Sequence, residues 1–167
     1  MLELVHGGVA FGSRRLASAR YLIRDTEVSD VYALAANLRL GDRLEIASFG
    51  KEPRSALRLS YRNAILRRTA IVDGEIAAMW GLGGSMLDDT GYPWLITAPA
   101  IERIPISFLR EGRREVARML RLRRVLIGEV AAAYTQACRF LEVLGFELGE
   151  PRPMFKGDLF RSYRMER

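Results

Sequence analysis

The sequence predicts an α+β domain in which helices cover both faces of a mixed β-sheet. Segment 92–146 alternates two nearly continuous apolar runs, Trp94–Thr97 and Val125–Val130, with two helical patterns. Such runs are typical of neighbouring strands that are covered on both faces and joined by a crossover helix. Before this unit, Asp73-Gly74 separates two strand-like runs, and this residue pair is favoured in the two-residue turn of a hairpin. An antiparallel half followed by crossover strands predicts a mixed sheet.

The N-terminal half of the domain is predicted to contain one short strand and three helices. The strand is expected at Tyr21–Arg24, and the helices are expected to end near residues 38, 50 and 67. Candidate N-terminal caps for the first helix are Asp25, Thr26 and Ser29. We expect Gly41 and Asp42 to break that helix, while Pro53 suits the first turn of the third.

The hairpin is expected to pair Thr69–Val72 with Ile76–Leu82, which ends in a cluster of glycines. That cluster leads into another strand rather than a helix, so it is not a dinucleotide-binding fingerprint and indicates a bulge or loop. Asp88 and Asp89 lie in a polar loop and indicate a turn rather than a metal site.

The C-terminal half begins with the strand at 94–97 and a long helix over 105–124, whose apolar positions are Ile106, Leu109, Val116 and Leu120. After the strand at 125–130, a shorter helix ends at Gly145, the usual residue at a helix C-terminus. A strand after Gly145, a proline-containing loop and a last strand at 159–165 complete the domain.

Composition excludes several kinds of site. The chain has 167 residues, of which 49% are hydrophobic, and this fits a single domain. Cys138 is the only cysteine and His6 the only histidine, which argues against disulfides, a histidine triad and a multi-histidine metal site. We expect Cys138 to be buried in the core. No apolar run approaches the roughly 20 residues of a membrane span. Residues 1–19 read as an N-terminal arm, and residues 20–167 as the domain.

Positive charge gathers on the long helix. The formal net charge is +6, and seven arginines lie between residues 110 and 124 beside only two glutamates. One hypothesis is a protein-docking face formed by Arg110, Arg113, Arg114, Arg118 and Arg121. A solvated helix face is equally open, and binding to DNA through its phosphates is a third alternative. The dominance of arginine over lysine can also reflect the coding bias of a GC-rich genome.

Several segments carry a resemblance to a known fold. The order of elements, with LEVLGF closing the last helix before a strand, resembles the GCN5-related N-acetyltransferase (GNAT) fold over about residues 20–165. GYPWLIT, FLREGRREVARML, RFLEVLGF and LFRSYRM are more closely similar to a family of short-tailed bacteriophage internal virion proteins with a degenerate form of that fold. This resemblance implies a virion or host-cytoplasmic location, contacts with other phage virion proteins and an oligomer within an assembly.

The GNAT resemblance also implies where acetyl-CoA would bind. In that family the cofactor lies in a V between the fourth and fifth strands, and a glycine-rich loop before the crossover helix holds its diphosphate. Here the corresponding segment, APAIERIPIS, contains no glycine and has two prolines, each of which lacks an N–H donor. Leu141 stands where many of these enzymes have a tyrosine acid, and Tyr134 stands near their asparagine.

These departures lead to the functional expectation. The sequence predicts a non-catalytic phage structural or assembly protein with no catalytic residues, no metal and no cofactor. The alternatives are an acetyl-CoA-dependent N-acetyltransferase and, third, a basic nucleic-acid-binding protein.

Overall fold

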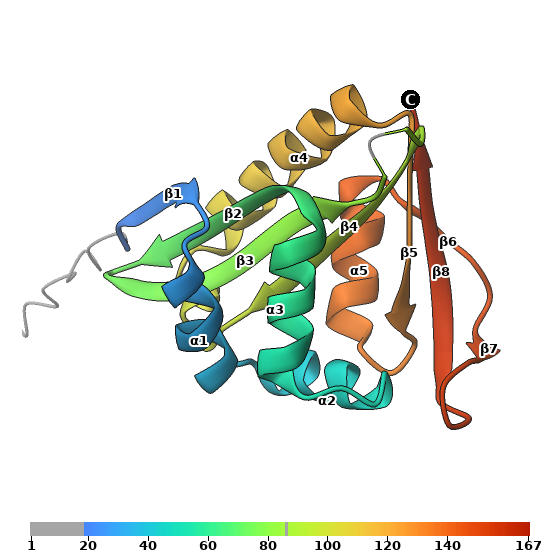
Figure 1. The fold of residues 1–167 in the computed structure, drawn as a ribbon, viewed down its shortest axis with the longest axis horizontal. Helices are drawn as coiled ribbons and strands as arrows, with labels where there is room; N and C mark the ends of the chain where they lie inside the picture. Colours follow the sequence, from blue (N-terminus) through green and yellow to red (C-terminus); the bar gives the residue numbers. More distant parts are fainter. Residues whose placement is uncertain (1–18, 86) are drawn as a thin grey trace, which may run out of the picture.

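A computed structural model describes residues 19–85 and 87–167, and it confirms the α+β architecture. In this part of the chain eight strands form one mixed sheet, in the order β1-β2-β3-β4-β5-β8-β6, with β7 paired to β8 (Figure 1). The strands are β1 (Tyr21–Asp25), β2 (Ala64–Val72), β3 (Glu75–Gly83), β4 (Thr90–Thr97), β5 (Val125–Ala131), β6 (Glu147–Leu148), β7 (Arg152–Pro153) and β8 (Leu159–Glu166).

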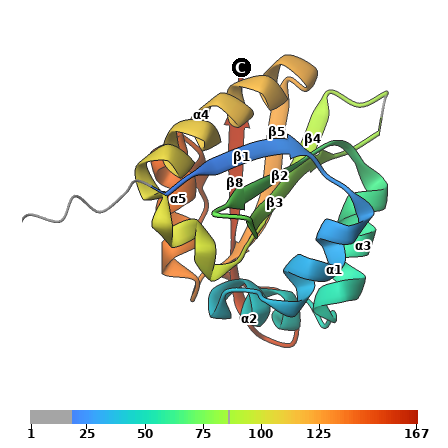
Figure 2. The ribbon, with the colours of Figure 1, turned by 90° about the vertical axis from the view of Figure 1, so that its left-hand side faces the viewer.

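Helices lie on both faces of the sheet, as Figure 2 shows. The helices are α1 (Val28–Ala36), α2 (Leu40–Ser48), α3 (Pro53–Asn63), α4 (Pro105–Leu122) and α5 (Thr135–Leu144), with a 3₁₀ helix η1 (Pro99–Arg103). Two apolar clusters follow from this arrangement. The cluster on the face of α4 and α5 contains Trp80, Leu82 and Leu126, while the cluster under α1, α2 and α3 contains Leu34, Leu57 and Met79. Alternating residues of β3 therefore serve opposite cores.

The predicted turns and caps are confirmed in part. Asp73 and Gly74 both have positive φ, as the hairpin turn requires, and Gly145 ends α5 in the left-handed conformation. The predicted caps of α1 are wrong, because Glu27 is its N-cap and forms a capping box with Asp30.

Two helix boundaries also differ from the sequence prediction. Gly41 and Asp42 lie inside α2 rather than ending the first helix. Gly41 lacks a Cβ that would overlap the ring of Tyr134, so glycine lets α2 approach the start of α5. The third helix ends at Asn63, because residues from Ala64 onward pair with β3 instead.

Of the predicted arm, residues 1–18 lie outside the described residues, whereas Ala19 packs against the core on the α4 face. Cys138 is buried, as expected. None of the helices in the described ranges is long and apolar enough to span a membrane.

Candidate functional site

The candidate site is the gap between β4 and β5. These parallel strands pair only at Thr90 with Val125 and at Gly91 with Leu126, and then diverge. Pro93 lies two residues after Gly91, and its ring nitrogen has no hydrogen to donate to a neighbouring strand. The proline of this central strand thus lies where the hydrogen-bonded pairing of β4 with β5 ends.

The main chain of β4 directs polar groups into this gap. The N–H of Ala98 donates to the C=O of Ala77, so the main-chain polar groups of Ala98 face β3. These groups point to alternate sides along a strand, so the main-chain groups of Thr97, Leu95 and Pro93 face away from β3 and into the gap. The Tyr163 hydroxyl donates to Pro93 C=O at 2.7 Å, and Thr97 N–H donates to Asp42 Oδ1 at 3.3 Å. Between them, the N–H and C=O of Leu95 face the middle of the gap.

Tyr163 closes the narrow end of the gap. It lies on β8 directly opposite Gly128 of β5, and a Cβ on Gly128 would overlap its ring and hydroxyl. The absence of that side chain lets the ring cross β5 and reach Pro93. Phe146 packs edge-on against the ring, with centroids 5.3 Å apart. Burial raises the pKa of Tyr163, so the phenol keeps its proton.

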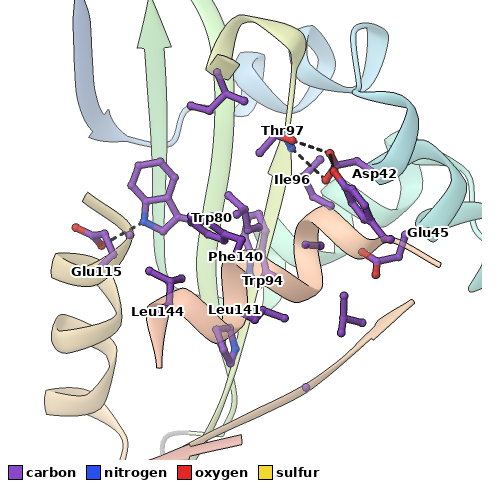
Figure 3. A pocket seen from close by; sticks show the side chains of 18 of the residues that line it. Asp42, Glu45, Trp80, Trp94, Ile96, Thr97, Glu115, Phe140, Leu141 and Leu144 are labelled. Atoms are coloured by element: carbon purple, nitrogen blue, oxygen red, sulfur yellow. Dashed lines mark hydrogen bonds between the residues drawn. The ribbon is translucent and has the colours of Figure 1, made fainter. Parts of the chain in front are cut away.

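A cavity of about 1040 Å³ occupies the rest of the gap. Its lining includes Ala56, Leu59 and Ser60 of α3, on one face of the sheet. On the other face it includes Val116 of α4 and Leu144 of α5. Side chains from both faces line the same space, so the cavity passes through the sheet where β4 and β5 part. Figure 3 shows α5 running past it, with Phe140, Leu141 and Leu144 beside Trp80.

A polar cluster closes the wide end of the gap. Asp42 of α2 accepts hydrogen bonds from the Thr97 hydroxyl at 2.6 Å and from the Tyr134 hydroxyl at 3.0 Å. Glu45, one turn later, accepts the N–H of Ala131 at 2.7 Å. Helix α2 is thereby joined to the ends of both diverging strands. Figure 3 shows its bonds to Thr97 of β4.

The cluster is desolvated, and this changes its titration. Burial, followed by the nearby Asp42 carboxylate, raises the pKa of Glu45 to about 7. Burial likewise raises the pKa of Asp42, and burial together with the negative charge of Asp42 raises that of Tyr134. Glu45 can therefore exchange a proton near neutral pH, while Tyr134 remains a hydrogen-bond donor.

On the α4 face the cavity meets a buried carboxylate. Glu115 is 8% exposed and accepts the indole N–H of Trp80 at 3.2 Å. Phe108 of α4 and Phe140 of α5 stack with ring centroids 5.0 Å apart, which joins the two helices. Ile106, expected in the core, is instead 81% exposed, and Met119 is buried in its place among the α4 residues.

The segment after β4 is the 3₁₀ helix η1 rather than a glycine-rich loop. The N–H of Ile101 donates to Ala98 and that of Ile104 to Ile101, so these amides are used within the turn. Pro105 begins α4, and Phe108 N–H donates to Ile104. In the first turn of α4, the main-chain N–H groups of Ile106 and Ser107 are therefore those without a hydrogen-bond acceptor inside the helix.

Solved structures with a similar fold include several acetyltransferases. The chain superposes on an N-acetyltransferase from Staphylococcus aureus Mu50 with a TM-score of 0.66 and 15% identity, covering 88% of this chain and 98% of that one. It matches the ribosomal-protein-S18-alanine N-acetyltransferase from Escherichia coli with a TM-score of 0.62 and 17% identity, covering 88% and 94%. The fold is that of the GNAT acetyltransferases.

A third GNAT-fold structure was solved with ligands. It is spermidine N-acetyltransferase from Vibrio cholerae, in complex with CoA and spermine, and it matches with a TM-score of 0.61 and 16% identity over 87% of this chain and 95% of that one. No family model and no curated protein matches the sequence. The expected link to phage virion proteins stays a prediction.

The five arginines of the predicted docking face divide into two sets. Arg114, Arg118 and Arg121 line a groove between α4 and the edge of the sheet, whereas Arg110 and Arg113 do not line it. None of the five lines the cavity between β4 and β5. Among the described residues, no group of three or more acidic, histidine or cysteine side chains could hold a metal ion.

Sequence reasoning missed Asp42, Glu45, Glu115 and Tyr163. Carboxylates on helices usually face solvent, and only the tertiary arrangement buries Asp42 and Glu115 and partly buries Glu45. One available signal was Pro93, because a proline inside a predicted central strand predicts a break in the ladder.

Proposed function

We propose that this protein transfers an acyl group from an acyl-coenzyme A to an amine, the alternative that the sequence suggested. The observation that carries this proposal is the cavity that passes through the sheet between β4 and β5. Two ligands that enter from opposite faces can meet in such a cavity without competing for one entrance. The GNAT fold of the chain supports the same function.

The described residues fit the arm of the cofactor better than its diphosphate. The Leu95 N–H and C=O face the gap, where the amides of a pantetheine arm can pair with them, and the surrounding lining is largely apolar. At the start of α4, the N–H groups of Ile106 and Ser107 would hold the diphosphate, favoured by the helix dipole. Arg110, which donates to the Ser107 hydroxyl at 3.3 Å, is the nearby cation.

When bound, the cofactor supplies an acyl thioester as the donor. Glu45 accepts a proton from the ammonium group of the acceptor, which must be neutral to attack a carbonyl. The amine loses a second proton as the amide forms and the C–S bond breaks, and that proton leaves with the released thiol. Leu95 N–H faces the space where negative charge would develop. Tyr134 keeps its proton and orients Asp42, and α2 and Tyr134 keep water from the wide end of the gap.

The decisive test is a calorimetric titration with acetyl-CoA, followed by an assay of thiol release with a panel of amines. A dissociation constant in the low micromolar range, about −8 kcal/mol, together with amine-dependent thiol release supports the proposal. Glu45→Gln should then lower turnover by about 10²- to 10⁴-fold while binding changes little. Absence of binding refutes it.

A second candidate is the non-catalytic structural or assembly role expected from the sequence. The observation that favours it is η1, whose amides bond within the turn and which is followed by Pro105. In this case acetyl-CoA does not bind, and the protein acts through contacts with virion proteins in the virion or host cytoplasm. The same titration decides between the two, and a protein of this class would co-purify with assembled particles.

A further inference from the structure

Strand β1 forms one edge of the sheet. Within residues 19–85 and 87–167 it pairs with β2 on one side, and no described strand pairs with its other side. The N–H of Asp73 donates to the C=O of Arg20, so the C=O of Arg20 faces the β2 side. Main-chain N–H and C=O groups point to alternate sides along a strand, so those of Tyr21 and Ile23 lie on the outer side. An edge of this kind can accept an additional strand.

A groove with many arginines runs beside this edge. It has a volume of about 360 Å³ and lies between α4 and the outer strands of the sheet. Its lining consists of Ile23, Arg68, Glu111, Arg114, Glu115, Ala117, Arg118 and Arg121. The Tyr21 hydroxyl donates to Glu111 Oε1 at 3.3 Å, which holds the start of β1 against α4. Figure 2 looks onto this edge, with β1 in front and α4 next to it.

The charges in the groove are unbalanced. Four guanidinium groups face two carboxylates, and both carboxylates already have partners: Arg114 donates to Glu111 at 2.6 Å, while Glu115 accepts from Trp80 and lies 3.8 Å from the guanidinium group of Arg118. Arg68 pairs with Asp25 at the end of β1. The hydrogen bond that the structure describes for the Arg121 side chain goes to the C=O of Ala117 at 3.4 Å, not to a carboxylate.

We propose that this groove binds an extended acidic segment of a partner protein, added as a strand to the edge of β1. In an added strand, every second side chain points the same way, about 6.8 Å apart. Arg114 and Arg118 are separated by a rise of about 6 Å along α4. Carboxylates at alternate positions of the partner would therefore meet successive arginines, whose planar donors suit bidentate pairing.

The groove favours a peptide over a nucleic acid for two reasons. Glu111 and Glu115 interrupt the positive surface, which opposes a continuous row of phosphates but not spaced carboxylates. Ile23 and Ala117 offer apolar contact, whereas no aromatic side chain in the lining could stack on bases. Residues 1–18 of this chain contain one glutamate and two arginines, so charge does not favour them as the occupant.

The test uses a dye-labelled eight-residue peptide of alternating glutamate and valine, measured by fluorescence anisotropy with the full-length protein. We expect binding that weakens with salt, and at least about tenfold weaker binding by Arg114→Glu/Arg118→Glu. The matched control is Arg110→Glu/Arg113→Glu, which makes the same charge change on the same helix outside the groove and should change affinity less than about twofold. Arg121→Glu is a third variant that removes no ion pair, and it should also weaken binding.

Peptide chemistry separates strand addition from simple charge attraction. N-methylation at every second residue removes the donors along one edge of the peptide, so one of the two possible methylated sets should abolish binding and the other should not. Equal tolerance of both sets overturns the proposal, as does unchanged affinity in Arg114→Glu/Arg118→Glu, or no binding of the peptide. Preference for a single-stranded oligonucleotide over the peptide also overturns it, in favour of a nucleic acid. Acetyl-CoA binding, measured in Arg114→Glu/Arg118→Glu and in Arg121→Glu, should not change, so this proposal and the proposed function fail separately.

Discussion

Glu45 is predicted to make the stability of the protein fall as pH rises through neutrality. Its pKa is raised from 4.5 to about 7 in the folded protein, so the folded state binds this proton more tightly than the unfolded state does. The contribution to stability is therefore complete below about pH 4.5 and is lost as pH rises through about 7. A shift of about 2.5 units at 1.36 kcal/mol each corresponds to about 3 kcal/mol.

The substitution Glu45→Gln isolates this contribution. Glutamine stays neutral at every pH, and its side-chain oxygen can still accept the N–H of Ala131. The variant should match the wild-type protein near pH 4.5 and exceed it by up to about 3 kcal/mol at pH 8. The pKa of Asp42 is also raised. Its titration therefore makes the stability of both the wild-type protein and the variant fall as pH rises.

Urea unfolding followed by tryptophan fluorescence at pH 5, 6, 7 and 8 measures the difference directly. Glu150→Gln is the matched control, because it removes an exposed carboxylate outside the cluster. A difference between Glu45→Gln and the wild-type protein that stays constant within about 0.5 kcal/mol across this range would show that Glu45 is not desolvated, and the argument for a general base would fail.

Three further predictions concern the gap, the buried carboxylate and the N-terminal residues. Gly128→Ala should displace the ring of Tyr163 and cost about 1–3 kcal/mol in chemical unfolding, whereas Gly83→Ala, whose Cβ would lie 3.6 Å from the nearest atom, should cost less. Trp80→Phe should destabilise by about 1–3 kcal/mol because Glu115 loses its indole donor, and the double variant with Glu115→Gln should be less destabilised than the sum of the two single changes. Deletion of residues 1–18 should leave the thermal unfolding midpoint nearly unchanged, because the cores that the structure describes are formed by later residues, and a clear fall would assign those residues to the fold.

The order of elements could be predicted because each core-facing segment repeats its apolar residues with the period of its own structure. The boundary between α3 and β2 could not. Residues 64–67 continue a plausible helix, but Ala64 pairs with Gly83 and the next residues extend the hairpin, so tertiary pairing overrides local preference. The 3₁₀ helix η1 is too short to carry a periodic signal.

The site was less predictable than the fold because its parts come together only in three dimensions. Asp42 and Glu45 look like ordinary polar residues of a surface helix until α2 crosses the ends of β4 and β5. The alternation in β8 predicts a strand, but the reach of the Tyr163 hydroxyl depends on Gly128 of another strand. A single sequence does not specify which residues face each other across a sheet.

The open gap itself favours a ligand. Parting two central strands leaves main-chain N–H and C=O groups without their ladder partners, and such groups require other partners when water is excluded. Side chains supply such partners at both ends of the gap. Tyr163 bonds to the C=O of Pro93, Asp42 to the N–H of Thr97, and Glu45 to the N–H of Ala131. Within residues 19–85 and 87–167, none of these side chains bonds to Leu95, in the middle. A protein that only needed a rigid sheet would be more stable with the ladder closed, and the proposed acyl-coenzyme A ligand would supply the missing partner in the middle of β4.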